Sequence, residues 1–548
     1  MPGQAAIAAV SNLKKGVFGM KLSLQSIQDA QAWKGYHLPQ YDVAAVAART
    51  KAAPRWLHFG AGNIFRAFPC VVAQRLIENG DMDTGIVCCE GYDDEIVTSC
   101  FHPVDNLTIA VTLNPDGNID KEVVGSLCES LTMKHDAARV AEIFRSDSLQ
   151  MVSFTITEKG YSLRNAQHEL MPAVAEDMAN GPAGCKSFMA QLAALCIERF
   201  RAGAKPLALV SMDNCSHNGE KLQNAVMEIV EAWQKNGRIS AEEAAYFTTG
   251  VTFPWSMIDK ITPRPNESVE AELTADGLED IKPFVTARHT YIAPFVNAEK
   301  PQYLVIEDLF PGGRPPLEKG GIIFTDRDTV NRVEKMKVGT CLNPLHTCLA
   351  VYGCLLGYTS IAAEMKDEDL TQFITKMSHD EGLPFVVNPG IIDPEQFLDE
   401  VLTVRFPNPF MPDTPQRIAT DTSQKLGVRF GETIKAYAAS PDHKASDLKL
   451  IPLVLAGWLR YLTGVDDEGK PFDCSPDPLL DSLKKQLADA KLGGENDAEM
   501  LRPILSDASI FAVNLYDIGL AGKVAGYWQE MMAGPGAVRA TIRKYVKG

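Results

Sequence analysis

Apolar and polar positions repeat in two different ways along this chain, and the change lies near residue 328. Before it, short apolar runs bounded by glycine, proline and asparagine indicate buried strands joined by turns. After it, apolar residues recur at helical spacing almost to the C-terminus, with a proline-rich interruption at 406–415. We therefore predict two domains: 1–328, an α/β domain with an N-terminal extension, and 329–548, a mostly α-helical domain.

The clearest unit of the first domain is a strand, a glycine turn, a helix and a second strand. Residues 55–60 and 85–90 have the apolar pattern of strands, and residues 71–78 between them have that of a helix. This order is typical of a Rossmann-type dinucleotide-binding fold. The fold class predicted for the whole chain is thus an α/β Rossmann-type N-terminal domain with a mostly α-helical C-terminal domain.

The glycine turn predicts how a dinucleotide would be held. Gly60 allows a tight turn, and Gly62 lets the backbone approach a pyrophosphate. The residues that open the next helix supply N–H groups to that anion. A third glycine is absent, because Phe65 stands near its place, and the simpler interpretation is any glycine turn of an α/β protein. The residues predicted to contact the pyrophosphate are Gly60, Gly62, Asn63, Ile64 and Phe65.

An acid ends the second strand of this unit. Glu90 lies 28 residues beyond Gly62. Its carboxylate would accept hydrogen bonds from ribose hydroxyls and repel a 2′-phosphate, which favours NAD over NADP. We therefore predict NAD as the cofactor.

Polar clusters follow two more predicted strands. Residues 150–157 end at Thr157, and residues 206–212 end just before Asp213 and Asn214. Ligands of parallel sheets bind at the carboxyl ends of strands, so both clusters are predicted at the site, with Thr157 beside the cofactor. Residues 105–135 alternate around an Asn-Pro-Asp-Gly-Asn turn and predict a hairpin.

One polar stretch, residues 333–346, precedes a long apolar run in the second domain. Asn343 followed by proline predicts a helix start with Asn343 as the N-cap, and Gly339 is predicted to end the preceding helix. Glu334 and Lys337 would then lie one turn apart on one helix, and Asn343 and His346 would share a face of the next. Taken alone, this stretch favours a simpler interpretation, with a surface lysine, a capping asparagine and a structural histidine.

Composition narrows the class of protein. Over 548 residues the formal net charge is −17, which argues against binding to nucleic acid or to anionic membranes. The twelve cysteines include no C-x-x-C pair, so reduced thiols in the cytoplasm are expected. No signal peptide and no apolar stretch long enough to span a bilayer is visible. Oligomeric state, monomer or dimer, stays open.

Seven separated motifs between residues 40 and 540 resemble the long-chain polyol dehydrogenase family, which includes mannitol dehydrogenases and hexuronate reductases. They are Gly60-Ala-Gly-Asn-Ile-Phe-Arg-Ala67, Thr155-Ile-Thr-Glu-Lys-Gly-Tyr161, Asp213-Asn-Cys-Ser-His-Asn-Gly219, Phe253-Pro-Trp-Ser-Met-Ile-Asp-Lys-Ile-Thr-Pro263, Val305-Ile-Glu-Asp308, the Lys337/Asn343/His346 cluster, and Arg405 through Arg417 to Asp421-Thr-Ser-Gln-Lys425.

The resemblance implies metal-independent hydride transfer between NAD(P) and a secondary alcohol, with a lysine as acid or base. It assigns proton transfer to Lys337 and polarisation of the reacting oxygen to Asn214 and Asn343. His346 would contact substrate, and Glu334 would relay the proton to water. Substrate binding is implied for Asp259, Arg405, Arg417 and Lys425. For Arg405 a structural salt bridge is an equally good interpretation.

The sequence departs from the family pattern at one position. The family places its lysine five residues before the asparagine, whereas Lys337 is six residues before Asn343. The glutamate three residues ahead of the lysine is present as Glu334, which favours Lys337 over Lys335. We therefore predict a one-residue insertion around Gly339 or Thr340.

The expected substrate is a sugar acid or a polyol. Thr420 stands where mannitol-type relatives tend to carry histidine, which favours the keto-uronate reductases and the interconversion of D-fructuronate and D-mannonate. The alternatives are mannitol/fructose or tagaturonate as substrate, a non-catalytic NAD-binding sensor of sugar acids, and a zinc-dependent alcohol dehydrogenase. The spacing of His346 between Cys341 and Cys348 fits no common zinc site, so no metal is expected.

Overall fold

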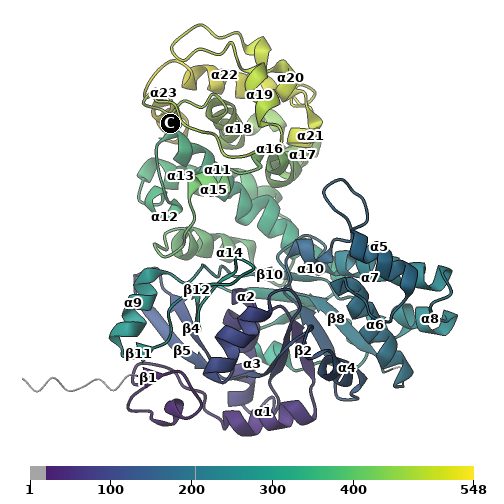
Figure 1. The fold of residues 1–548 in the computed structure, drawn as a ribbon. Coiled ribbons are helices and arrows are strands. Elements are labelled where there is room, and N and C mark those ends of the chain that lie inside the picture. The colour runs from purple at the N-terminus through teal and green to yellow at the C-terminus, as the bar shows by residue number, and fades with distance from the viewer. Residues whose placement is uncertain (1–19, 204, 548) are drawn as a thin grey trace, which may run out of the picture.

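The computed structural model describes residues 20–203 and 205–547 and consists of two lobes joined at a narrow waist (Figure 1). The first lobe is α/β and the second is almost wholly helical, as predicted. The last strand, β16, ends at Thr325, and α10 begins at Arg327. None of the helices in the described ranges combines the length and the apolar character needed to cross a membrane.

The α/β lobe is built on a parallel sheet of six strands in the order β6-β3-β2-β7-β8-β9. Its four central strands are buried along their whole length, because helices cover both faces of the sheet. The strands are β6 Leu127–Thr132, β3 Ile86–Glu90, β2 Trp56–Phe59, β7 Met151–Phe154, β8 Leu207–Ser211 and β9 Val251–Thr252.

Two separate cores lie on the two faces of this sheet. One face packs against α4 Ala137–Arg145, α5 Pro172–Asn180, α6 Phe188–Arg201, α7 Asn218–Lys235 and α8 Ala241–Thr249. The other packs against α1 Val43–Ala52, α2 Asn63–Ala67 and α3 Pro69–Glu78. The strands and helices predicted at 55–60, 71–78, 85–90, 150–157 and 206–212 are confirmed, with ends shifted by a few residues.

Smaller sheets extend this lobe toward the helical lobe. The predicted hairpin is confirmed as β4 Thr108–Leu113 and β5 Ile119–Val124, and β14 Phe295–Glu299 joins it. A second sheet holds β10 Ser256–Asp259, β15 Tyr303–Glu307 and β16 Ile323–Thr325. The remaining elements are α9 Glu267–Ala275, the pair β1 Met20–Lys21 and β11 Leu278–Glu279, and the pair β12 Phe284–Val285 and β13 Tyr291–Ile292.

The helical lobe is organised around α11 and α18, whose residues are almost all buried. Its helices are α10 Arg327–Met336, α11 Asn343–Leu355, α12 Ile361–Glu364, α13 Glu368–Lys376, α14 Pro394–Glu400, α15 Pro415–Ile418, α16 Thr422–Leu426, α17 Glu432–Ala439, α18 Leu450–Tyr461, α19 Leu480–Gln486, α20 Arg502–Leu505, α21 Ala508–Phe511, α22 Ala521–Met531 and α23 Ala537–Lys547. The core of this lobe also takes in Met257 and Val305 of the α/β lobe, so apolar packing continues across the waist.

Two predicted helix boundaries are wrong. Gly339 does not end a helix, because α10 continues into a π-helical segment, Lys337–Cys341, closed by a hydrogen bond from the Leu342 N–H to the Lys337 carbonyl. Asn343 is not an N-cap but the first residue of α11, and its side chain makes no capping bond. A π turn takes one residue more than an α turn, so this segment can absorb an extra residue without displacing its neighbours. The predicted insertion around Gly339 or Thr340 falls inside it.

A buried carboxyl group lies against α11. The side chain of Glu364 is fully buried, and neither of its oxygens has a hydrogen-bond partner among the described residues. Gly353 leaves it room, since a Cβ there would overlap the carboxylate. Burial raises the pKa of Glu364 to about 9, so the group is neutral in the folded protein at pH 7.

We expect Glu364→Gln to stabilise the protein at alkaline pH. Because the pKa of Glu364 is higher in the folded than in the unfolded state, the folded state binds more protons between pH 4.5 and 9, and wild-type stability falls as pH rises. The gain of the variant over wild type should grow by up to about 1.4 kcal/mol per pH unit between pH 5 and 8. Urea unfolding at several pH values measures it, with Glu368→Gln, an exposed acid, as the control. A gain independent of pH would contradict the assignment.

Candidate active site

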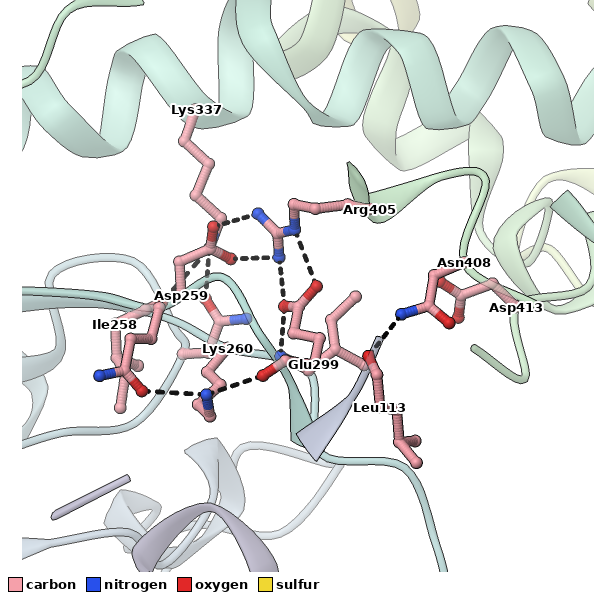
Figure 2. Close-up of polar contacts among 12 residues, drawn as sticks. Leu113, Ile258, Asp259, Lys260, Glu299, Lys337, Arg405, Asn408 and Asp413 are labelled. Atoms are coloured by element: carbon pink, nitrogen blue, oxygen red, sulfur yellow. Dashed lines mark hydrogen bonds and ion pairs between the residues drawn. The ribbon is translucent and has the colours of Figure 1, made fainter. Parts of the chain in front are cut away.

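Lys337 projects from the start of the π-helical segment into the waist between the lobes (Figure 2). Its side chain is only 6% exposed, and its Nζ lies 2.9 Å from Oδ1 of Asp259. The same nitrogen donates at 3.3 Å to Oδ1 of Asn214 and to the carbonyl of Ile258. An amine of the helical lobe is thus held by three groups of the α/β lobe.

Asp259 belongs to a longer chain of buried charges. The guanidinium of Arg405 donates to both oxygens of Asp259, at 2.5 and 3.2 Å, and to both oxygens of Glu299, at 2.8 and 3.0 Å. Burial alone would raise the pKa of Asp259, but the charges of Lys337 and Arg405 outweigh it and hold that pKa below its ordinary value. Figure 2 shows the two carboxylates on either side of the guanidinium. Arg405 therefore faces protein carboxylates.

A cavity of about 250 Å³ lies beside Lys337. Asn214, from the loop after β8, lines it together with Asn343, from the first turn of α11, and Glu334, one turn before Lys337. It shares Ser216, Glu334, Val338 and Val428 with a larger cavity of about 700 Å³ between the lobes. The structure thus brings together four of the five residues predicted for catalysis, on a space suited to a small molecule.

His346 lies elsewhere. It lines a separate cavity of about 10 Å³, the size of one water, together with Arg405 and Asp413. Its Nε2 has no hydrogen-bond partner among the described residues and lies 3.8 Å from Asp413. Burial, and then the nearby guanidinium groups of Arg429, Arg405 and Arg417, lower the pKa of His346 to about 3, so the ring is neutral. Its ring packs on Phe406, 4.4 Å away between centroids.

The two other predicted substrate-binding cations lie further along the helical lobe. The side chain of Arg417 is 62% exposed and pairs with Asp413. Lys425 is half-buried in α16, and its Nζ donates to the carbonyl of Thr420 at 2.5 Å. Burial, and then the charge of Arg429, lower the pKa of Lys425.

The glycine turn at the end of β2 is tightly constrained. Gly60 has φ +106°, and a Cβ there would overlap the carbonyl oxygen of Thr155 on the neighbouring strand. At Gly62 a Cβ would meet only open space, which leaves room for a ligand beside the turn. Phe65 is fully buried, and its ring stacks on that of His58 with 4.1 Å between the ring centroids. It therefore supports the turn from the protein interior. Asn63 accepts a hydrogen bond from Arg66. The turn and its open side fit a pyrophosphate.

Glu90 lies directly under this turn. One of its oxygens accepts the N–H of Ala61 at 2.8 Å, and the other accepts those of Tyr92 and Asp93 at 2.8 and 3.2 Å. The carboxylate therefore shapes the turn as well as placing a negative charge beside it. Thr157 lies at the end of the neighbouring strand with the strained value φ +66°, held by a hydrogen bond from its N–H to Asp213.

Two further residues support the site, and no individual role had been predicted for either. Glu299 is completely buried and forms an ion pair with Arg405. The sequence feature that could have revealed it is a charged residue at the end of a mostly apolar strand, β14. Asp213 fixes the neighbouring loop by accepting hydrogen bonds from Ile156, Thr157 and Tyr161. Within the described residues, no group of three or more histidine, cysteine or acidic side chains is arranged to hold a metal ion.

Both lobes match models of known protein families. Residues 54–319 match the mannitol dehydrogenase Rossmann domain, and residues 329–532 match the mannitol dehydrogenase C-terminal domain. The chain belongs to the mannitol dehydrogenase family. Members of this family bind NAD or NADP and catalyse oxidation and reduction.

Individual members of the mannitol dehydrogenase family match most of the chain. A D-mannonate oxidoreductase of Thermotoga maritima is 50% identical over 535 residues, covering 96% of this chain and 99% of that protein. A D-sorbitol dehydrogenase solved in substrate-free form has a TM-score of 0.75 at 26% identity, covering 93% of this chain and 98% of its own. The Pseudomonas fluorescens mannitol 2-dehydrogenase, solved with NAD and D-mannitol, shares the fold, with a TM-score of 0.69 at 24% identity, covering 96% of this chain and all of its own.

We expect Arg405→Met to lower the free energy of unfolding by about 3–5 kcal/mol, because it leaves Asp259 and Glu299 buried beside each other without their shared cation. Arg502→Met, which removes an exposed arginine paired with Glu499, should leave the stability close to that of the wild type. The urea-unfolding midpoints of the two variants measure the difference. Equal midpoints would show that the buried network contributes little to stability.

Proposed function

We infer that this protein is an NAD-dependent D-mannonate oxidoreductase, which interconverts D-fructuronate and D-mannonate. The observation that carries this conclusion is the 50% identity to a D-mannonate oxidoreductase over nearly the full length of both chains. The aligned region covers 96% of this chain, so it includes both the cofactor turn and the waist cavity. The buried lysine beside two carboxamides supplies the groups that reduction of a ketone requires.

We assign the chemistry of the reacting carbonyl to three residues of the waist cavity. A nicotinamide dinucleotide held at the glycine turn of Gly60 and Gly62 would supply or accept the hydride. Asn214 and Asn343 each have an amide N–H to donate to the carbonyl oxygen, and such donors stabilise the negative charge that develops there. The Oδ1 of Asn214 already accepts from Lys337, which leaves its amide nitrogen to face the substrate. Lys337 then delivers a proton to that oxygen.

Asp259 and Arg405 act as positioning residues for Lys337. Asp259 holds the amine of Lys337 at 2.9 Å and so fixes where the lysine can deliver its proton. Arg405 holds Asp259 in place from the other side. Glu334 lines both the waist cavity and the larger one, so it is placed to return a proton to Lys337 from solvent.

The other end of the substrate lies against the helical lobe. Arg417 and Lys425 carry positive charge there and are assigned to this end of the sugar acid. The family resemblance also assigns a contact with the substrate to His346, which is neutral and one turn from Asn343.

The preference for NAD over NADP rests on Glu90. Its negative charge lies under the glycine turn, where a 2′-phosphate would be repelled. Asn63, Ile64 and Thr157 complete the predicted cofactor contacts around the turn and the neighbouring strand end. All twelve cysteines have free thiols, which supports the assignment of the protein to the cytoplasm.

A substrate screen tests the proposed function. With NADH, kcat/KM should be highest for D-fructuronate and lower for D-tagaturonate and D-fructose, and NADPH should support slower reduction than NADH. The rate of NADH oxidation measures each value. A higher kcat/KM for D-fructose than for D-fructuronate would make the protein a polyol dehydrogenase and overturn the proposal.

Lys337→Met should lower the rate of D-fructuronate reduction by about 10²–10⁴-fold, because the variant has no acid beside the carbonyl oxygen. NADH binding, followed by fluorescence, should be unchanged, since the glycine turn is not altered. Lys335→Met is the matched control, because Lys335 is exposed on the same helix and should retain wild-type kcat. Loss of turnover in Lys335→Met instead would move the acid by two residues.

A further inference from the structure

A cluster of positive charge surrounds the first two turns of α11 on the helical side. Arg417, Lys425 and Arg429 all contribute to it, and the charges of Arg417 and Arg429 help to lower the pKa of His346. Arg417 is balanced by Asp413. The other two differ, because neither Lys425 nor Arg429 has a carboxylate within 4.0 Å in the described ranges 20–203 and 205–547.

Arg429 is the most exceptional of the three. It has five N–H donors and makes one side-chain hydrogen bond, from Nη1 to Oγ1 of Thr347 at 2.6 Å. Burial lowers the pKa of Arg429 to about 10. A cation taken out of water is costly unless an anion compensates it, and none of the described acidic side chains does so here. The position is therefore suited to an anion that comes from outside the chain.

The place of Arg429 links this charge to the reaction. Its partner Thr347 lies one turn beyond Asn343 on α11, and Oγ1 of Thr347 donates to the Asn343 carbonyl. Lys425 precedes Arg429 by four residues on the same continuous helical stretch. Arg429 also lies in a π-helical segment, Gly427–Gly431, as Lys337 and Arg405 do in theirs. Such segments are frequent at functional sites.

We propose that Arg429, with Lys425, binds the carboxylate of the sugar acid and thereby sets the preference for a keto-uronate over an uncharged ketose. In D-fructuronate the carboxylate is four C–C bonds from the ketone carbon, a span close to one helical turn, about 5 Å. This is the separation between Asn343, which faces the carbonyl, and Thr347, which holds Arg429. A guanidinium grips a carboxylate through two parallel N–H bonds. The assignment rests on the proposed function and names Arg429 as the residue that determines substrate specificity.

Arg429→Gln tests the proposal. KM for D-fructuronate should rise by about 10²–10³-fold, because one partner of a buried charge pair is lost. The kcat at saturation should change little, and kcat/KM for D-fructose should stay at the wild-type value or increase. Arg429→Lys keeps the positive charge but cannot form the two parallel N–H bonds, so it should recover part of the loss. Arg502→Gln, at an exposed arginine of the same lobe, is the matched control and should behave as wild type.

The outcomes separate the two claims. An equal loss on D-fructuronate and D-fructose in both Arg429 variants, or no loss on either, would overturn the role of Arg429 while leaving the reaction assignment intact. If Arg429→Gln does not fold, Arg429→Lys decides alone, and an unchanged ratio of kcat/KM between the two substrates would refute the proposal. A wild-type enzyme that does not reduce D-fructuronate would refute the proposed function and this inference together.

Discussion

Four buried charges connect the two lobes of this dehydrogenase in one line: Lys337, Asp259, Arg405 and Glu299. Two of them come from the helical lobe and two from the α/β lobe. None could be buried alone, because an isolated charge away from water is costly. The amine of Lys337 is therefore in place only when both lobes are docked, and docking is favoured only when the charges meet. This constraint ties the two lobes together at the waist, where the proposed chemistry would take place.

The partners of each cation distinguish a structural role from a proposed substrate-binding role, which the sequence alone does not separate. Arg405 saturates two carboxylates and fixes the geometry, whereas Lys425 and Arg429 have no carboxylate within 4.0 Å among the described residues. The family resemblance left a structural salt bridge as an equally good interpretation for Arg405, but not for Arg417. The coordinates show the partners of each cation: Arg405 has a carboxylate on each side, Arg417 pairs with Asp413, and Arg429 has no such partner among the described residues.

Much of the fold follows from local sequence, and the site follows only in part. The strands around Gly60 and Glu90 could be predicted because apolar runs and turn residues act locally, and the requirement for glycine at residue 60 follows from one close backbone contact. The N-cap role of Asn343 and the helix end at Gly339 were predicted wrongly, because local capping signals do not reveal a π turn that continues the preceding helix. The partners of Arg405 are 106 and 146 residues away, so only the folded chain brings them together.

The positioning of Lys337 by Asp259 is the point on which the mechanism depends most. The most direct measurement is kcat for D-fructuronate reduction by the wild type and by Asp259→Asn, expressed per NADH-binding site so that the value does not depend on how much enzyme is folded. Loss of the carboxylate 2.9 Å from the amine should lower kcat by about 10²-fold, because the proton donor is no longer held in place. An unchanged kcat in Asp259→Asn would contradict the account.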